Sequence, residues 1–330
     1  DWQYLDHGGG GWHGGDDIIA VDPVRPETVY FSAICEGQFC LDVSVDGGLT
    51  WEQKGGSANP LPSGYASNLC ISDAIAPSPA VPGRVLVGAT ILSEAGAGES
   101  DGIFYVSDDY GETWSQGAFP MGMKAITEIK YDAFDANLIY AATVNSGLWR
   151  SEDGGDNWAR VPVIDGVSLL SVNAIAVHPN EPDKVYIMAS DATLENPESP
   201  LYISADRGES WIERPAIVAS DGLIVAPAKP DQVFYSLYSA CSGLCRSGDD
   251  GLTWTTNTDI PRPTVLVTAA EGDRSIIYLG SAGGLVTSAR NRAEAVPGLG
   301  SVAGGGVYRL TKLLEVNEIF LPFVTGASAP

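Results

Sequence analysis

Apolar and polar residues alternate along this chain in short runs separated by turns, a pattern typical of β-strands. One arrangement recurs six times: an apolar strand, a residue pair that usually ends in proline, a polar turn and a second apolar strand. The second strands carry anchor residues 44 to 56 positions apart, namely Tyr30, Leu86, Tyr140, Tyr186, Phe234 and Tyr278. This spacing fits a four-stranded sheet with one loop of variable length. We therefore predict six sheets that begin near residues 18, 71, 126, 173, 223 and 264.

Five of these units contain the same block, Ser-x-Asp-x-Gly-x-(Thr/Ser/Asn)-Trp. Its aspartates are Asp46, Asp109, Asp153, Asp206 and Asp249, and its tryptophans are Trp51, Trp114, Trp158, Trp211 and Trp254. Short Ser and Asp side chains satisfy turn amides, and Gly adopts backbone conformations that a side chain disfavours. The tryptophan that opens the next strand can cover the hairpin with its ring. We predict that each block is a structural hairpin between the third and fourth strands of its sheet.

The sixth unit lacks this block, and two alignments of its third strand are open. Either residues 284–288 form that strand, or residues 306–311 do, with 285–305 inserted before them; we favour the insertion. One further strand is needed to join the last sheet to the first. Residues 2–5 and residues 316–324 are the two candidates for it.

The eight-residue block resembles the Asp-box, or BNR, repeat of sialidase-like β-propellers. This resemblance implies an all-β fold: one propeller domain over residues 1–330, with six four-stranded blades, or seven. Residues 2–11 and 18–23 also resemble the opening of xyloglucanase-type propellers. Those enzymes continue with Arg-Thr-Asp-x-Gly-Gly, whose Asp is catalytic, whereas this chain has Ser32-Ala-Ile-Cys-Glu36-Gly-Gln. The Phe-Arg-Ile/Leu-Pro motif of sialidases is absent as well.

The charge of the chain limits its partners. Its 18 basic and 42 acidic residues give a formal net charge of −24, which opposes binding to nucleic acids or anionic membranes. The apolar runs are far shorter than the roughly 18 residues needed to cross a bilayer. We therefore expect no nucleic-acid partner and no transmembrane segment.

Four of the five cysteines form two close pairs, Cys35 with Cys40 and Cys241 with Cys245. Each pair flanks a glycine-containing turn, where side chains across a hairpin can approach within disulfide distance. Disulfides are the favoured interpretation, with a metal site or free thiols as alternatives, and Cys70 is expected to be a buried, unpaired residue. The start at Asp1 rather than Met suits either a processed, mature protein or a trimmed chain. With the cysteine pairs, we favour an exported protein that is secreted, extracellular or on the cell surface.

Candidate chemistry is sparse. In propellers of this kind, ligands usually meet the loops between second and third strands and between blades. Acidic residues there are weak catalytic candidates, with solvated charge or calcium ligation as alternatives: Asp17, Glu36, Asp101 and Asp191. His7, His13 and Asp16 are weak metal candidates in a glycine-rich segment, and no other cofactor is indicated. Trp12, Tyr65 and Tyr238 are the aromatic candidates for binding a ligand.

Because the known catalytic motifs are missing, the sequence favours a non-catalytic propeller. Such a protein would recognise a protein or carbohydrate surface, or would bind an assembly partner outside the cell. The alternative is a glycoside hydrolase or lyase that uses acidic loops on the same face.

Overall fold

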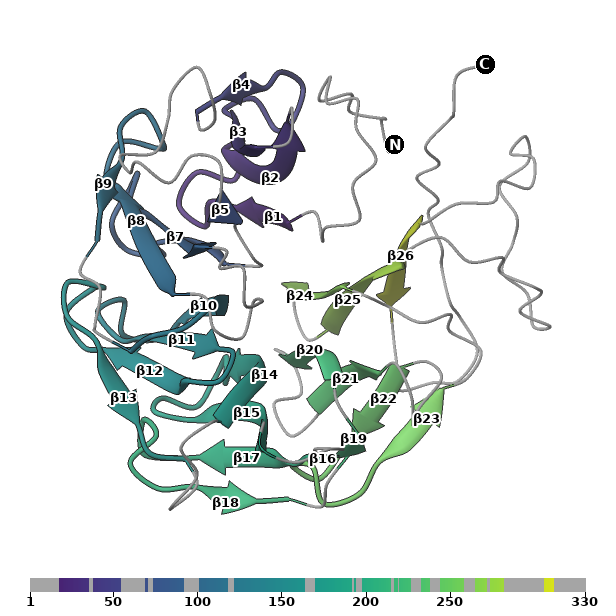
Figure 1. Cartoon of the computed structure of the whole chain (residues 1–330). Helices are drawn as coiled ribbons and strands as arrows, with labels where there is room; N and C mark the ends of the chain where they lie inside the picture. The colour runs from purple at the N-terminus through teal and green to yellow at the C-terminus, as the bar shows by residue number, and fades with distance from the viewer. Residues whose placement is uncertain are drawn as a thin grey trace, which may run out of the picture. The chain divides into compact units, whose positions relative to one another are not determined.

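The computed structural model describes residues 18–35, 38–54, 69–70, 74–91, 101–117, 122–163, 170–191, 193, 198–214, 217–218, 220–226, 233–237, 244–257, 265–271, 274–281 and 306–311. All regular secondary structure within these ranges is β-strand, and every pairing is antiparallel (Figure 1). Each strand pairs with the next one along the chain in most cases, so the sheets are simple meanders.

Six sheets follow one another, and we number them one to six in chain order. Sheet one contains β1 (Ile18–Val21), β2 (Val29–Cys35), β3 (Gln38–Ser44) and β4 (Glu52–Gln53). Sheet two contains β6 (Ile75–Pro77), β7 (Val85–Ile91), β8 (Gly102–Ser107) and β9 (Ser115–Gln116), and β5 (Leu69–Cys70) also pairs with β7. Sheet three contains β10 (Ile126–Tyr131), β11 (Ile139–Thr143), β12 (Gly147–Ser151) and β13 (Ala159–Val161).

The second half of the chain repeats this plan. Sheet four contains β14 (Leu170–Val177), β15 (Val185–Asp191), β17 (Leu201–Ser204) and β18 (Ile212–Glu213). Sheet five contains β20 (Ser220–Val225), β21 (Val233–Leu237), β22 (Leu244–Ser247) and β23 (Thr255–Asn257). Sheet six has three described strands, β24 (Val265–Glu271), β25 (Arg274–Ser281) and β26 (Gly306–Thr311). A separate two-stranded sheet pairs β16 (Glu198–Ser199) with β19 (Ile217–Val218).

The predicted all-β architecture of four-stranded sheets is confirmed. First strands begin at residues 18, 75, 126, 170, 220 and 265, close to the positions that the repeat predicted. In sheet six, β26 pairs with β25 from Ile276 opposite Thr311 to Ser281 opposite Gly306, as the favoured insertion requires. The two segments proposed to join the ends of the array, 2–5 and 316–324, lie outside the described residues.

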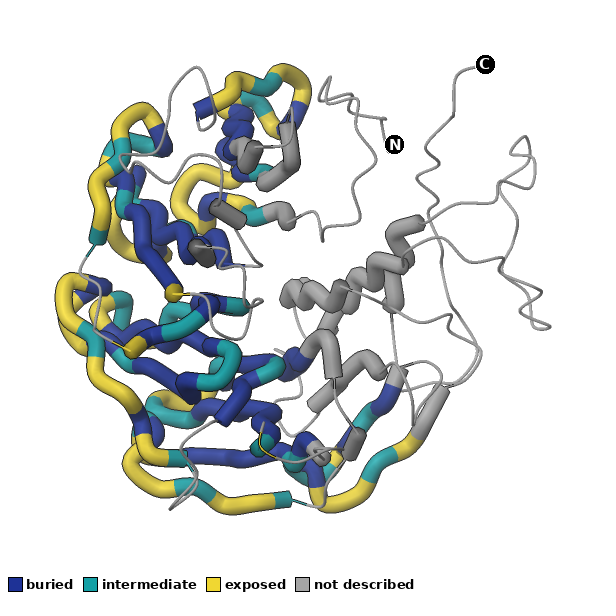
Figure 2. Tube along the Cα trace, in the orientation of Figure 1, coloured by how far each residue is buried: buried dark blue, intermediate teal, exposed yellow. Residues whose placement is uncertain are grey.

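The middle strands of the sheets form the core. β11 and β8 are almost wholly buried, whereas the short fourth strands β4, β9 and β18 are exposed (Figure 2). Both faces of a middle strand are covered because neighbouring sheets pack face to face. One cluster, for example, joins Leu86 and Phe104 of sheet two to Ile126, Ile139 and Trp149 of sheet three. This packing explains why these strands are continuously apolar rather than strictly alternating.

The chain divides into two compact units. The N-terminal unit comprises residues 5–172 and 191–193, and the C-terminal unit comprises residues 1–4, 173–190 and 194–330. Sheets one to three belong to the N-terminal unit, and sheets five and six belong to the C-terminal unit. The prediction of one domain over residues 1–330 stays a prediction.

Candidate functional site

Each sheet has two ends with different roles. One end, which we call the turn end, carries the turn between the first and second strands and the box hairpin between the third and fourth. The other end, which we call the loop end, carries the connection between the second and third strands and the link to the next sheet.

The box hairpins at the turn end are held by their own side chains. In sheet three, Ser151 Oγ donates to Asp153 Oδ1 at 2.9 Å and accepts the amide of Gly155 at 2.9 Å. Asp153 Oδ1 accepts the amide of Asn157 at 2.8 Å, and the indole of Trp158 donates to the carbonyl of Gly155 at 3.0 Å. The same serine and aspartate bonds recur in the other four boxes. The predicted hairpins between third and fourth strands are therefore confirmed.

Two consecutive residues in every box have a left-handed backbone. The residue after the aspartate is Gly47, Tyr110, Gly154, Arg207 or Asp250, with φ between 55° and 76°, and a glycine follows it in each case. The second position is glycine because its φ of 78° to 97° places a side chain in conflict with the backbone. The box aspartates are stabilised as anions in this setting. The hydroxyl and amide of Thr50 lower the pKa of Asp46 to about 2, and those of Thr253 lower the pKa of Asp249 to about 2.

In sheets one to four, the turns between first and second strands share one feature, a side-chain acceptor for two successive amides. Asp132 Oδ1 accepts the amides of Phe134 and Asp135 at 2.9 and 3.0 Å. Asp22 and Ser78 act in the same way in sheets one and two. In sheet four the acceptor is the Nδ1 of His178, a fully buried side chain that receives the amides of Asn180 and Glu181 at 3.2 and 2.7 Å.

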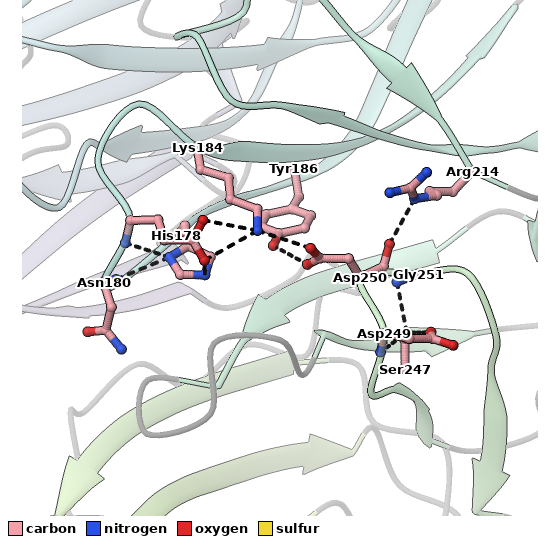
Figure 3. A network of polar contacts seen from close by, with 10 residues as sticks. His178, Asn180, Lys184, Tyr186, Arg214, Ser247, Asp249, Asp250 and Gly251 are labelled. Atoms are coloured by element: carbon pink, nitrogen blue, oxygen red, sulfur yellow. Dashed lines mark hydrogen bonds and ion pairs between the residues drawn. The ribbon is translucent and has the colours of Figure 1, made fainter.

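A polar network connects this histidine turn to the box of sheet five, within the C-terminal unit (Figure 3). Lys184 Nζ lies 3.1 Å from Asp250 Oδ2, and the hydroxyl of Tyr186 donates to Asp250 Oδ1 at 2.6 Å. Burial and this bond raise the pKa of Tyr186. Arg214 Nε donates to the carbonyl of Asp250 at 3.0 Å. These polar groups at the turn end satisfy one another and hold neighbouring sheets together.

The loop end of sheet two carries one of the predicted carboxylates. Asp101 precedes β8 and pairs with Lys124, which lies in the link to sheet three. The two residues form an isolated β-bridge, and Lys124 Nζ lies 3.0 Å from Asp101 Oδ1. Gly102 has no room for a side chain, because a Cβ there would collide with the carbonyl of Lys124. The link therefore lies directly against the start of β8, and this close approach fixes the position of Asp101.

The loop end of sheet three continues this row of polar groups. The connection between β11 and β12 is short, and its Ser146 Oγ accepts the amide of Lys124 at 2.9 Å. Asn145, with φ of 60°, donates its amide to Ser171 Oγ at 3.0 Å, and Ser171 Oγ donates back to Asn145 Oδ1 at 3.1 Å. Sequence reasoning did not identify Lys124, Asn145 or Ser171, because only the pairing of the links brings them beside Asp101 and Ser146.

Asp191 is the other predicted catalytic carboxylate that the structure describes, and it is the last residue of β15. Its Oδ1 accepts the amide and the hydroxyl of Thr193 at 2.9 and 2.6 Å, and these bonds lower its pKa. The other candidates for catalysis, metal binding and ligand binding lie outside the described residues: Asp17, Glu36, His7, His13, Asp16, Trp12, Tyr65 and Tyr238. Among the described residues, no group of three His, Cys, Asp or Glu side chains could hold a metal ion. Nor does the described part contain a helix long and apolar enough to span a bilayer.

The structure describes three of the four cysteines that were predicted to pair, namely Cys35, Cys40 and Cys245. Cys245 is fully buried and disulfide-bonded, whereas Cys241 lies outside the described residues. In the hairpin of β2 and β3, Cys35 is opposite Gln38 and Cys40 is opposite Ala33. Cys35 and Cys40 are thus diagonal neighbours, whose Cα atoms are typically about 7–8 Å apart, beyond the roughly 4.4–6.8 Å that most disulfides span, so this bridge would require the backbone to shift. Both pairings stay predictions.

Comparison with known proteins identifies relatives of several kinds. The profile of the Sortilin-Vps10 family, described as sortilin, neurotensin receptor 3, matches residues 102–240. A xyloglucanase from a Paenibacillus species is 27% identical over 172 residues, which are 47% of this chain and 16% of that protein. A sialidase from Micromonospora viridifaciens is 26% identical over 250 residues, which are 71% of this chain and 37% of that protein. The crystal structure of the GH74 xyloglucanase from Xanthomonas campestris has a TM-score of 0.57 at 20% identity and covers 79% of this chain and 44% of that chain.

These relatives correct one prediction and confirm another. The chain spans less than half the length of each of the three proteins. The interpretation as a non-catalytic recognition protein is wrong, since the matches to xyloglucanases point to a glycoside hydrolase. That interpretation relied on the absence of the xyloglucanase and sialidase motifs, but this absence still leaves carboxylates in the other loops. With its five box hairpins and these relatives, the chain belongs to the Asp-box (BNR) propeller superfamily, which includes the sialidase-like and xyloglucanase-type propellers.

Proposed function

We propose that this chain is a glycoside hydrolase, or one part of a larger one, that acts on a xyloglucan-type polysaccharide at the loop end of its sheets. The observation that carries the proposal is the sequence match to xyloglucanases, with 27% identity over 172 residues. A propeller fold supports it, because its loops bring side chains from several sheets to one end.

Glycoside hydrolysis needs two carboxyl groups, one as general acid and one as nucleophile or general base. Asp191 suits the second role, because the hydrogen bonds from Thr193 keep its pKa low and hence keep it ionised. Asp101, Glu36 and Asp17 are the remaining candidates of the proposal. A retaining mechanism would place the two groups about 5 Å apart, and an inverting one would place them about 6.5–9.5 Å apart.

The test is release of reducing ends from xyloglucan, with carboxymethylcellulose and a sialyl-lactose as alternative substrates. Asp17→Asn, Glu36→Gln, Asp101→Asn and Asp191→Asn are assayed separately. Loss of a catalytic carboxyl group is expected to lower kcat by at least 100-fold with the fold intact.

Asp156→Asn is the matched control. Asp156 and Asp101 are both exposed, at 67% and 57%, and each pairs with one cation, Arg84 at 3.1 Å and Lys124 at 3.0 Å. The two differ in position, because Asp156 belongs to a box at the turn end. Full activity in all four variants, or no hydrolysis of any glycan by the intact chain, would contradict the proposal.

We further propose that the protein is exported, as an enzyme acting on an extracellular polysaccharide has to be. The disulfide-bonded Cys245 supports this location, because structural disulfides persist in oxidising compartments. Cell fractionation of the source organism with an antibody against the chain tests it, and recovery in the cytosol alone would contradict it.

A further inference from the structure

The exposed apolar side chains of the N-terminal unit gather at the turn end of its sheets. Among the described residues of this unit, all the exposed large apolar side chains lie in or beside a turn or a box: Val21, Val24, Val45, Leu49, Val81 and Phe134. Val81 is 45% exposed and Phe134 is 55% exposed, and they occupy the turns of sheets two and three.

The turn geometry does not require apolar residues at these positions. In sheet four, the equivalent turn makes the same pair of amide bonds to His178 and carries the polar residues Asn180 and Glu181. The choice of Phe134 in sheet three, where sheet four has Asn180, therefore has no explanation in the local fold. Single exposed apolar residues are ordinary on protein surfaces, and it is a contiguous exposed apolar patch that marks an interaction surface.

A cavity of about 290 Å³ opens beside these two turns, where β6 and β10 end. Its walls are mostly apolar or aromatic, including Pro77, Ile129 and Tyr131, and they also include the charged residues Lys130 and Asp132. Sites for whole small molecules begin at about 300 Å³ and bury most of their ligand. A shallow cavity at that lower limit suits one or two apolar side chains of a larger partner.

Carboxylates surround this apolar surface. Asp135 follows Phe134, and Asp108 and Asp156 are 69% and 67% exposed on the two boxes. Both boxes lie against the turns, since Tyr110 donates its amide to the carbonyl of Gly83 and Gly154 donates its amide to the carbonyl of Asn137. Two cations lie here and each is paired with carboxylates: Arg84 is shared between Asp108 and Asp156 at 3.5 and 3.1 Å, and Lys130, which lines the cavity, pairs with Glu128 at 2.7 Å.

From these observations we infer that the cavity with Val81 and Phe134, which we call the turn-end surface, binds a cationic peptide segment of another protein. An apolar side chain of the segment enters the cavity, and flanking Lys or Arg residues meet the carboxylates. A second copy of this chain is disfavoured as the occupant, because each copy carries a net charge of −24. The surface lies at the end of sheets two and three opposite to Asp101, so it is independent of the proposed hydrolysis.

The probe is a fluorescein-labelled ten-residue peptide of alternating Lys and Leu, with an alternating Lys and Ser peptide of equal charge as reference. Binding to the full chain is measured by fluorescence anisotropy at low salt. The Lys-Leu peptide is expected to bind at least 10-fold more tightly than the Lys-Ser peptide. Replacing the two exposed side chains together (Val81→Ser with Phe134→Ser) is expected to remove that preference.

Val45→Ser with Leu49→Ser is the matched control, because both side chains are exposed, at 61% and 64%, and both lie within the box of sheet one in the same unit. It is expected to change the affinity less than 2-fold. Equal binding of the two peptides would show that charge attraction alone explains the binding, and it would overturn the inference. So would equal losses in the two double variants, or a dimer in sedimentation velocity that the Val81/Phe134 variant abolishes.

Discussion

The histidine turn of sheet four tests whether these turns depend on a side-chain hydrogen-bond acceptor. In sheets one to three the acceptor is Asp22, Ser78 or Asp132, whereas in sheet four it is a histidine. His178→Ala removes the Nδ1 acceptor of two amides, those of Asn180 and Glu181. The histidine is fully buried, so the change also leaves a space beside Tyr186, whose ring centre lies 6.1 Å from that of the imidazole. An orphaned buried donor costs about 1–3 kcal/mol. Since Asn180 and Glu181 are exposed and water can reach one of the two amides, we expect a total loss of about 2–4 kcal/mol.

His178→Asn is the matched rescue, because its side-chain oxygen can accept both amides as Asp132 does in sheet three. It is expected to recover at least half of the lost free energy of unfolding. Urea denaturation followed by circular dichroism gives the free energies, and hydrogen exchange of the amides of Asn180 and Glu181 reports the turn directly. Equal destabilisation by the two variants would show that the buried ring, and not the acceptor, stabilises the turn, and the reasoning from the repeat would fail.

Three further predictions follow from the boxes and the cysteines. Trp158→Ala removes a half-buried ring stacked on Phe104 at 4.6 Å, as well as its bond to Gly155, and should lower the free energy of urea unfolding by about 2–4 kcal/mol. Trp158→Phe keeps the stacked ring and loses only the indole bond, so it should cost about half as much, and no measurable cost would argue against a role for that bond. The folded-state pKa of Asp46 is lowered to about 2 from its ordinary 3.8, so its stabilising effect is present above about pH 4 and is lost as the pH falls towards 2. Asp46→Asn should therefore flatten the dependence of the melting temperature on pH in that window, and an unchanged slope would contradict the assignment. Mass spectrometry of the unreduced protein should find Cys241 linked to Cys245 and Cys35 linked to Cys40; alkylation of Cys35 without reductant would exclude the second pair.

Much of the fold can be predicted from the sequence, because the residues that form each box hairpin are close together in the chain and recur in five sheets. The block from Ser151 to Trp158 contains every group that its hairpin uses, and the bonds run between residues two to four positions apart. Five copies of such a block define the sheet period by themselves. The period by itself did not locate β26, because residues 284–288 keep the spacing of the other sheets and Gly306–Thr311 requires an insertion before it.

The loop end could not be predicted in the same way, because its contacts join residues far apart in the chain. Asp101 was a candidate only as one acid among many, and its partner Lys124 is 23 positions away. Asn145 and Ser171 are 26 positions apart and carry no motif. Only the packing of one sheet against the next brings the link before β10 to the start of β8, where a glycine leaves room for it. The network of His178, Tyr186 and Asp250 could not be predicted from the sequence either. Its hydrogen bond between Tyr186 and Asp250 forms only because the box of sheet five lies against the turn of sheet four.

The sequence alone thus determined the strands, their order and the hairpins, because backbone conformation and short-range hydrogen bonds are encoded within a few residues. The tertiary structure decided which side chains of different sheets meet, because those contacts depend on how whole sheets stack. The turn-end surface belongs to this second class: Val81 and Phe134 are unremarkable in the sequence. They form one surface with the cavity only where the turns of two neighbouring sheets lie together.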